Sequence, residues 1–301
     1  MTEFDFGSAT SDDIKRDLEG VDYLASDELA TICLLALRLG RPIYCEGEAG
    51  VGKTSLAFAL ANAYELPIFR LQCYEGLDAS QALYDWDFRK QMLYLRATQA
   101  SGGADGTDPD VLEATLYDRR FLQPRAVLNA LEASPSVLLI DEIDRADDEF
   151  EAFLLEALSD FSVTIPELGA IKAAVPPIVI VTSNRTREVH DALKRRCLYH
   201  WLNHPDRALE SAILRRKLKR LPGTLCDQIT NATQRLRGAN LRKPPGMAES
   251  LDWAAALIEL GAHELDHAAV SRTIGVILKY REDQEQIGRD DFGMLLAPSA
   301  T

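Results

Sequence analysis

The nine residues GEAGVGKTS, at positions 47–55, constrain the fold of this chain more than any other stretch. They fit the pattern GxxxxGK[ST] and follow a short apolar run at 41–46, which predicts a buried strand. An alanine- and leucine-rich helix is predicted next, at 53–64. A strand, a glycine loop and a helix in this order hold phosphate groups, because the loop N–H groups and the helix N-terminus both present positive partial charge. The candidate phosphate-binding residues are Gly47, Glu48, Ala49, Gly50, Val51, Gly52, Lys53, Thr54 and Ser55.

Two side chains of this loop have separate predicted roles. Lys53 is placed to reach the β- and γ-phosphate oxygens of a nucleotide. Thr54 offers its hydroxyl group to Mg²⁺. The loop therefore predicts a nucleotide and a magnesium ion as ligands.

A second motif, VLLIDEID, occupies residues 137–144. Its four apolar residues predict a buried strand, and two carboxylates, Asp141 and Glu142, follow at the strand's carboxyl end. Ligands bind at that end of an open α/β sheet. We expect Asp141 to hold the magnesium shell together with Thr54, and Glu142 to polarise the attacking water. Taken alone, the motif would also fit a solvated acidic turn.

A third motif, IVIVTSN at 178–184, is a further apolar strand that ends in polar residues. The amide of Asn184 is suited to orient water beside the γ-phosphate. A simple turn asparagine is the alternative.

Together these motifs favour ATP hydrolysis over other uses of a nucleotide. A Ras-type GTPase would need an NKxD sequence for guanine, and this tetrapeptide does not occur. A small-molecule kinase would have no use for a glutamate that activates water beside the magnesium aspartate. We therefore expect an ATPase that hydrolyses ATP to ADP and phosphate, with Glu142 and Asn184 as catalytic residues.

The order of predicted elements indicates an α/β fold. Five strands, at 41–46, 67–73, 137–141, 178–182 and 198–202, alternate with helices, which is the pattern of a parallel sheet. Residues 101–110 are rich in glycine and aspartate and predict a loop. After position 205 the apolar spacing is helical only. We expect a flexible lead-in at 1–20, an α/β nucleotide-binding domain at 21–205 and an all-α domain at 206–301.

Composition limits the partners and the compartment. The 301 residues carry a formal net charge of −14, which disfavours nucleic acid as the main partner. The first 20 residues have no apolar signal segment, and the apolar runs are too short to cross a bilayer, although peripheral membrane contact stays open. The five cysteines are scattered and odd in number, which indicates reduced thiols and a cytoplasmic protein.

Four stretches, GEAGVGKTSLA, LLIDEIDRADDEFEAFLLEAL, VTIPELGAIKAAVPPIVIVTSNRT and ALKRRC, resemble the MoxR branch of AAA+ ATPases. A fifth, KPPGMAESLDWAAAL, resembles the subgroup that matures aerobic carbon monoxide dehydrogenase and related molybdenum hydroxylases. The resemblance covers residues 20–281. The VTIPELG hairpin and the KPPGMAE segment distinguish the branch, because many P-loop ATPases share the first two motifs.

The resemblance implies a fold, an assembly and a set of partners. It implies a P-loop AAA+ domain with a five-stranded parallel sheet, followed by a small helical lid. It also implies a homohexameric ring that remodels a metalloenzyme client as a chaperone, together with a partner protein that carries a von Willebrand factor A domain. Two other functions stay open: a passive ATP-binding switch that gates a partner, and a DNA-associated AAA+ ATPase.

The resemblance also implies residues that act across subunits and from the lid. The family's arginine finger falls on Arg196, with Arg195 in place of an acidic residue, so either arginine is a candidate. Both would also fit a basic helix end. In the lid, Gly246 occupies the position of the family's second sensor arginine. Lys243 or Arg242 would substitute for it in binding the nucleotide, and a proline-capped helix start is the alternative.

Two further segments have alternative interpretations. The stretch at 74–95 lies where the family inserts a loop or hairpin that faces the ring pore. Its aromatic side chains would either pack within the hairpin or grip a client: Tyr84, Trp86, Phe88 and Tyr94. The stretch at 117–123 is expected to lie nearby. The basic run at 215–220 fits a solvated helix face or a contact with a subunit or partner.

Overall fold

Five short apolar segments form a parallel sheet in the order β2-β5-β8-β1-β9. The computed structural model describes residues 6–100, 109–289 and 292–296. The strands are β1 (Ile43–Gly47), β2 (Ile68–Gln72), β5 (Val137–Asp141), β8 (Ile178–Ser183) and β9 (Leu198–Leu202). Every residue of β1 and β5 is buried, as expected for central strands that are covered on both faces. The predicted α/β fold is confirmed.

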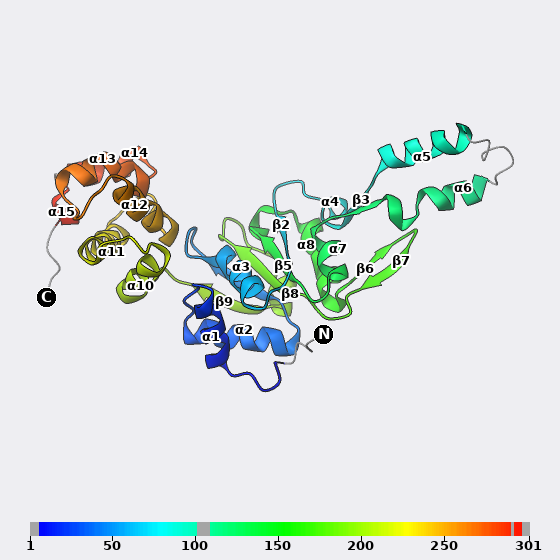
Figure 1. Cartoon of the computed structure of the whole chain (residues 1–301), viewed down its shortest axis with the longest axis horizontal. Helices are drawn as coiled ribbons and strands as arrows, with labels where there is room; N and C mark the ends of the chain where they lie inside the picture. The colour runs from blue at the N-terminus through cyan, green and yellow to red at the C-terminus, as the bar shows by residue number, and fades with distance from the viewer. Residues whose placement is uncertain (1–5, 101–108, 290–291, 297–301) are drawn as a thin grey trace.

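Helices cover both faces of this sheet because successive side chains of a strand point to opposite sides. One face packs on α1 (Ser11–Gly20), α2 (Asp27–Leu39) and α3 (Lys53–Ala63). The other face packs on α7 (Ala126–Glu132), α8 (Asp148–Asp160) and α9 (Asp191–Arg196). Along β1, Ile43 and Cys45 join the first core, and Tyr44 joins the second. The three layers are visible in Figure 1.

Local capping rules explain the ends of α2. The Ser26 hydroxyl accepts a hydrogen bond from the N–H of Leu29 at 3.1 Å, and Gly40 ends the helix in the left-handed conformation. A serine at the N-cap and a glycine just after the last turn are the residues that such ends favour. These two residues therefore set the bounds of α2 at its N-cap and its C-cap.

The prediction of a flexible lead-in at residues 1–20 is wrong for residues 11–20, which form α1. Thr10 and Asp13 form a capping box at its start, and Ile14 and Leu18 are fully buried against the first core. The i, i+4 spacing of these two apolar side chains is the amphipathic pattern that holds a short helix on a core.

An arm projects from the α/β domain between β2 and β5 (Figure 1). It begins with α4 (Ala79–Leu83) and β3 (Tyr84–Trp86), continues through α5 (Phe88–Ala100) and α6 (Pro109–Leu116), and returns through η1 (Arg119–Phe121) and β4 (Leu122–Pro124). β3 pairs antiparallel with β4, so the stretch at 117–123 does lie beside the arm's first strand. Of the loop predicted at 101–110, residues 101–108 lie outside the described residues, and 109–110 begin α6.

The aromatic side chains of this arm divide between the two interpretations. Three of them pack within the arm: Tyr84 on Trp86 (5.9 Å between ring centroids), Trp86 on Tyr117 (5.1 Å) and Tyr94 on Phe121 (5.5 Å). Phe88 is 66% exposed and lies on α5 near the exposed Met92 and Leu93. Only Phe88 of the four therefore stays open to a partner.

A second hairpin, β6 (Ser162–Ile165) paired with β7 (Gly169–Lys172), immediately precedes β8. It extends toward the same side of the molecule as the arm (Figure 1). This hairpin contains the VTIPELG stretch, with its turn beyond Ile165.

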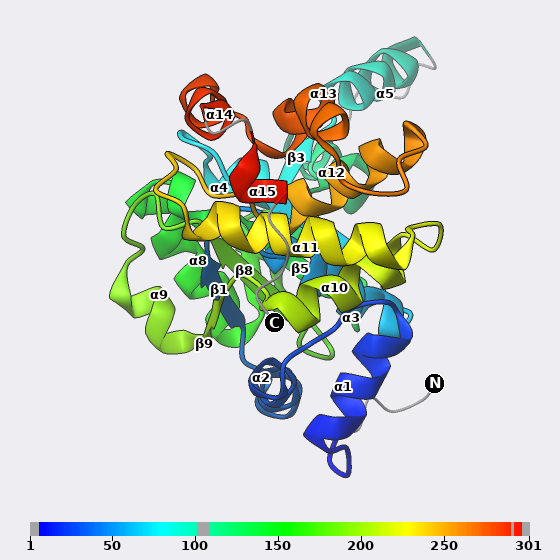
Figure 2. The same ribbon diagram turned by 90° about the vertical axis from the view of Figure 1, so that its left-hand side faces the viewer.

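Every regular element that the structure describes after position 205 is a helix, and these helices have their own core (Figure 2). Its helices are α10 (Arg207–Lys217), α11 (Gly223–Gly238), α12 (Met247–Glu259), α13 (His267–Ile277), α14 (Arg281–Gly288) and α15 (Gly293–Leu296). Trp253 is fully buried there, and its indole N–H donates to the Thr273 hydroxyl at 2.8 Å. Across the described residues no helix is both long and apolar enough to cross a membrane.

The basic run at 215–220 is largely paired with carboxylates of the same chain. Arg215 contacts Asp227, and Arg220 contacts Glu259. Arg216 contacts both Glu19 at the end of α1 and Asp22, which ties α10 to the N-terminal segment. These pairs favour a solvated helix face over a contact with a subunit or partner.

Candidate active site

The glycine loop between β1 and α3 is shaped by backbone conformations that favour glycine. Gly50 and Gly52 have φ values of +81° and +100°, a region that side chains with a Cβ rarely enter. Gly52 is the N-cap of α3, and no side chain caps that end. The first N–H groups of α3 therefore face the loop, as an anion-binding helix N-terminus requires.

Lys53 lies inside the curve of the loop. Its ammonium group donates to the carbonyl oxygens of Gly47 at 2.7 Å and Glu48 at 2.6 Å, and the residue is 6% exposed. Burial lowers the pKa of Lys53, while the carboxylates of Asp144, Asp141 and Glu142 act in the opposite direction. A cation held in this position suits a multiply charged phosphate chain, which would supply the countercharge that burial demands.

Asp141 stands at the carboxyl end of β5 and is almost fully buried. Its Oδ1 accepts hydrogen bonds from the hydroxyl groups of Thr54 at 3.0 Å and Thr182 at 2.6 Å. Hydroxyl and carboxylate oxygens are the ligands that magnesium prefers, either directly or through water. The paired oxygens of Thr54 and Asp141 therefore fit a magnesium ion at this edge of the sheet.

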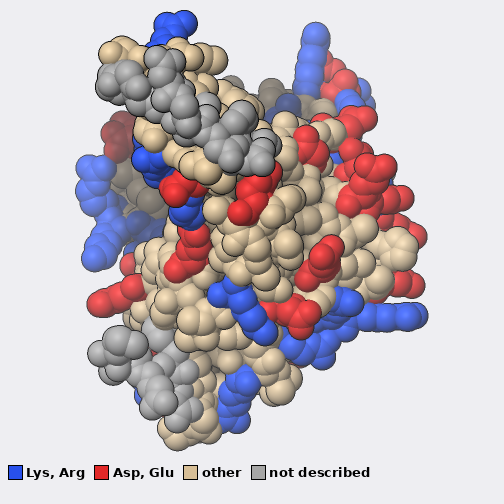
Figure 3. All heavy atoms as spheres, turned by 90° about the vertical axis from the view of Figure 1, so that its right-hand side faces the viewer, with Lys and Arg blue, Asp and Glu red and all other residues tan. Residues whose placement is uncertain are grey.

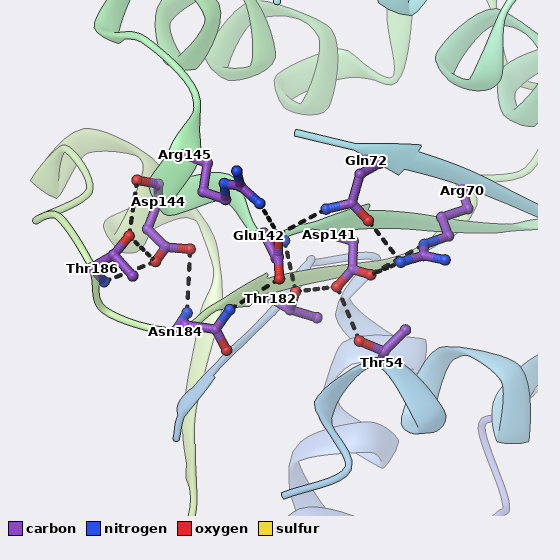
Figure 4. A network of polar contacts seen from close by, with 10 residues as sticks. All are labelled: Thr54, Arg70, Gln72, Asp141, Glu142, Asp144, Arg145, Thr182, Asn184 and Thr186. Carbon is purple, nitrogen blue, oxygen red and sulfur yellow. Dashed lines mark hydrogen bonds and ion pairs between the residues drawn. The ribbon is translucent and has the colours of Figure 1, made fainter. Parts of the chain in front are cut away.

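Glu142 follows in a left-handed backbone conformation, with φ at +57°. Such a conformation costs a non-glycine residue about 1 kcal/mol or more and persists only where surrounding contacts hold it. Its N–H donates to the Thr182 hydroxyl at 2.9 Å. Its carboxylate accepts from the Asn184 amide at 3.2 Å and the Gln72 amide at 3.0 Å, and pairs with Arg145 at 3.1 Å (Figure 4).

Asn184 is placed by a second set of contacts. Its N–H donates to Asp144 Oδ1 at 3.2 Å, and the Thr186 hydroxyl and N–H donate to Asp144 Oδ2 at 2.7 and 2.8 Å (Figure 4). Asp144 is buried in η2 (Ile143–Arg145), directly after Glu142. The end of β8 is thus tied to the turn that follows β5, which brings the predicted pair Glu142 and Asn184 together.

These groups surround a cavity of 280 Å³. A second cavity of 540 Å³ shares Gly52, Ser55, Met247 and Leu251 with it and extends toward the N-terminal segment and α10. The first is lined by Ala49, Gly50, Gly52, Lys53, Thr54, Ser55, Asp141, Glu142, Thr182, Asn184, Met247, Ala248 and Leu251.

The start of α12 rests directly on the glycine loop. The N–H groups of Met247 and Ala248 donate to the Gly50 carbonyl at 3.0 and 3.3 Å. A Cβ on Gly246 would lie 2.7 Å from the Ala49 carbonyl oxygen and 3.0 Å from Gly50 Cα. At Gly246 the backbone before α12 therefore lies directly against the backbone of the glycine loop. A residue with a Cβ does not fit there without a shift of one of the two segments.

Neither of the two predicted substitutes for a lid arginine lines the cavities at the phosphate loop. Lys243 is not among the residues that line either cavity, and its N–H donates to Asp283 at 3.2 Å. Arg242 stacks on the Tyr280 ring at 4.4 Å and lies near Glu282. The structure does not bring Lys243 to the phosphate loop, because the N–H groups of Arg242 and Lys243 both bind the Asp283 carboxylate of α14 and hold this segment there.

Arg195 and Arg196 lie outside this cavity, at the end of α9. Both are exposed. Arg41 donates to the carbonyl oxygens of Arg195 at 2.7 Å and Arg196 at 3.1 Å, which fixes the backbone there. The Arg196 guanidinium donates to the Leu155 carbonyl of α8 at 2.6 Å. Neither arginine lines either of the two cavities at the phosphate loop of its own chain.

Gly246→Ala is expected to weaken ATP binding roughly tenfold, because a methyl group at a 2.7 Å approach must push α12 off the loop. A titration with a fluorescent ATP analogue measures this effect. Gly238→Ala is the matched control, since a Cβ there would meet nothing within 4 Å. Equal affinity in the two variants would show that the contact of α12 with the loop does not matter for binding.

Several polar residues of the site escape prediction from the motifs. Arg70 and Gln72 contact Asp141 and Glu142 because β2 pairs with β5, with Gln72 level with Asp141. Strand order is not readable from the spacing of the strands. Arg145 and Asp144 lie within the second motif or directly after it, but their contacts depend on the turn of η2.

Fold and site together define a P-loop ATPase with a helical C-terminal region. Residues 43–202 match the family model of the ATPase family associated with various cellular activities, AAA, and the chain belongs to this family. As an AAA+ ATPase it binds ATP and depends on Mg²⁺, and proteins of this family generally form oligomers.

Among solved structures, the chain is similar to the RuvB Holliday junction branch migration motor of Thermotoga maritima. The two chains are 17% identical, the match covers 91% of this chain and 73% of RuvB, and the TM-score is 0.46. A proline-to-glycine mutant of the same RuvB gives 16% identity, coverage of 94% and 78%, and a TM-score of 0.48. No curated protein matches the sequence.

Proposed function

We propose that this chain is a cytoplasmic MoxR-type ATPase that remodels a metalloenzyme client, a molybdenum hydroxylase of the carbon monoxide dehydrogenase kind. The observation that carries the proposal is the KPPGMAE segment at 243–249. This segment carries the resemblance to the subgroup that matures molybdenum hydroxylases. It also supplies Gly246, Met247 and Ala248, which contact the glycine loop. The hairpin that contains VTIPELG, inserted before β8, adds support.

For hydrolysis, each polar group of the site has a proposed role. Lys53 and the N-terminus of α3 hold the phosphate chain, and Thr54 with Asp141 would hold Mg²⁺. When bound, magnesium supplies charge neutralisation on the phosphate oxygens. Glu142 accepts a proton from the attacking water, and Asn184 holds the Glu142 carboxylate in place.

The adenine base is proposed to lie in the 540 Å³ cavity. Apolar side chains from three separate segments line it, among them Leu24, Phe58 and Ile213. Such a slot suits a flat aromatic ring, while the adjoining 280 Å³ cavity suits the charged phosphates. Because Met247 and Leu251 of α12 line both, a nucleotide would contact the α/β domain and the lid together.

A homohexameric ring is proposed from the resemblance and from the position of the arginines. Arg195 and Arg196 lie away from the phosphate loop of their own chain. A neighbouring subunit whose phosphates they reach would gain the positive charge that offsets a transferring phosphoryl group. In such a ring the arm is proposed to contact the client through exposed Phe88, Met92 and Leu93, with a von Willebrand factor A protein as adaptor.

DNA is the alternative partner. On the face from which the arm projects, Figure 3 shows acidic and basic side chains interspersed. Among the atoms coloured there, no single broad basic surface runs across that face. A net charge of −14 also disfavours a polyanion. We therefore expect added duplex DNA to leave the ATPase rate unchanged, and stimulation by DNA would favour the alternative.

The client is tested in a host strain that lacks this protein. We expect the molybdenum hydroxylase polypeptide to accumulate there without activity. Wild-type protein should restore activity, and the Glu142→Gln variant should not, because remodelling requires hydrolysis. The measurements are hydroxylase activity and metal content of the purified enzyme. A fully active hydroxylase in the deletion strain would rule out the proposed client.

A further inference from the structure

The guanidinium of Arg70 forms an ion pair with Asp141, the proposed magnesium ligand. Arg70, on β2, donates from Nε and Nη2 to Asp141 Oδ2, at 3.1 and 2.6 Å (Figure 4). Asp141 uses its other oxygen, Oδ1, for the hydroxyl groups of Thr54 and Thr182. One oxygen of the buried Asp141 carboxylate thus binds the guanidinium. The other faces the hydroxyl groups beside the proposed magnesium position.

The same guanidinium reaches the catalytic glutamate through one intermediate. Arg70 Nη2 also donates to Gln72 Oε1 at 2.6 Å, and the Gln72 amide donates to Glu142 Oε2 at 3.0 Å. Both links run along the end of β2, where Gln72 lies level with Asp141 in the parallel pair. Arg70 therefore binds the Asp141 carboxylate directly. It also holds Gln72, which in turn binds the Glu142 carboxylate.

Arg70 and Asp141 differ in burial, and this difference shows that Asp141 relies on the ion pair more than Arg70 does. The Arg70 side chain is 49% exposed, whereas that of Asp141 is 4% exposed. Water can solvate the guanidinium without its partner, but the buried carboxylate relies on the guanidinium for charge compensation. A bound magnesium ion would provide the same compensation from the other side, so the two cations share one negative charge.

We propose that Arg70 is a positioning residue of the ATPase, which orients Asp141 and, through Gln72, Glu142, and which sets the magnesium requirement by sharing the charge of Asp141. The proposal rests on the assignment of Asp141 to the magnesium shell and is independent of the client. Arg70 makes two distinct contributions, its charge on Asp141 and its fork geometry toward Gln72, and these are separable by substitution.

The test measures binding of a fluorescent ATP analogue as a function of magnesium concentration. With Arg70→Ala, Asp141 keeps its full charge for the metal, so the half-saturating magnesium concentration should fall about tenfold. Turnover at saturating magnesium should also fall, because Gln72 loses its anchor. Arg70→Lys keeps the charge but cannot grip both partners, so it should keep the wild-type magnesium requirement and show the lowered turnover.

Two further variants make the outcomes distinguishable. Arg125→Ala is the matched control: its side chain is 50% exposed and is paired with the exposed Asp85, away from the site. It should leave the magnesium requirement unchanged. A wild-type or raised requirement in Arg70→Ala, or a lowered one in Arg70→Lys, would overturn the proposal. If Asp141→Asn binds the analogue with a wild-type requirement, the assignment of Asp141 fails, and the role of Arg70 fails with it.

Discussion

Glu142→Gln is expected to bind ATP as the wild type does while turnover falls by about 10²-fold or more, the loss expected when a general base or water-positioning group is removed. The glutamine keeps the shape of the side chain and can still pair with Gln72 and Arg145. It loses the negative charge that is proposed to draw a proton from water. We expect nucleotide affinity to depend mainly on Lys53 and the N-terminus of α3, which the substitution does not touch.

The measurement combines equilibrium binding with single-turnover hydrolysis. Glu149→Gln, an exposed glutamate in the first turn of α8, is the matched control and should behave as the wild type. Loss of binding in Glu142→Gln would instead assign Glu142 a structural role. It would also indicate that the strained backbone at Glu142 depends on the charged side chain.

Arg196→Ala is expected to bind ATP nearly normally and to hydrolyse it roughly 10³-fold more slowly, the scale at which an arginine finger acts. The finger would stabilise charge that develops mainly in the transition state, so ground-state binding should change little. The bond that Arg196 makes to the Leu155 carbonyl is exposed and is easily exchanged for water. Arg195→Ala, one residue away and also exposed, is measured in parallel, because either arginine is a candidate finger.

Mixed rings provide the sharper test of a shared site. Lys53→Ala subunits lack a working phosphate loop but keep the finger, and Arg196→Ala subunits have the reverse defect. Mixing them should recover activity that neither variant shows alone, because some interfaces then pair an intact loop with an intact finger. Mixtures that exchange subunits and stay inactive would exclude a finger from the neighbour. If Arg195→Ala shows the loss instead, the finger is Arg195.

The parts of the site that the sequence by itself determined are those governed by local physics. The left-handed conformations at Gly50 and Gly52 suit glycine almost alone, and the loop is framed by its own strand and helix. The same holds for the ends of α2 at Ser26 and Gly40. Each of these features depends on residues within a few positions of one another, so the motif and its context predict them together.

Only the tertiary structure decided which distant groups meet. Arg70 and Gln72 reach Asp141 and Glu142 because β2 lies beside β5, and strand order depends on the packing of the whole sheet. Lys243, one of two residues that the resemblance offered in place of a lid arginine, does not line the phosphate cavity, whereas the backbone of Gly246 meets the loop. Such contacts join segments far apart in the chain, and their free energy is a sum over many packed groups, which no local pattern encodes.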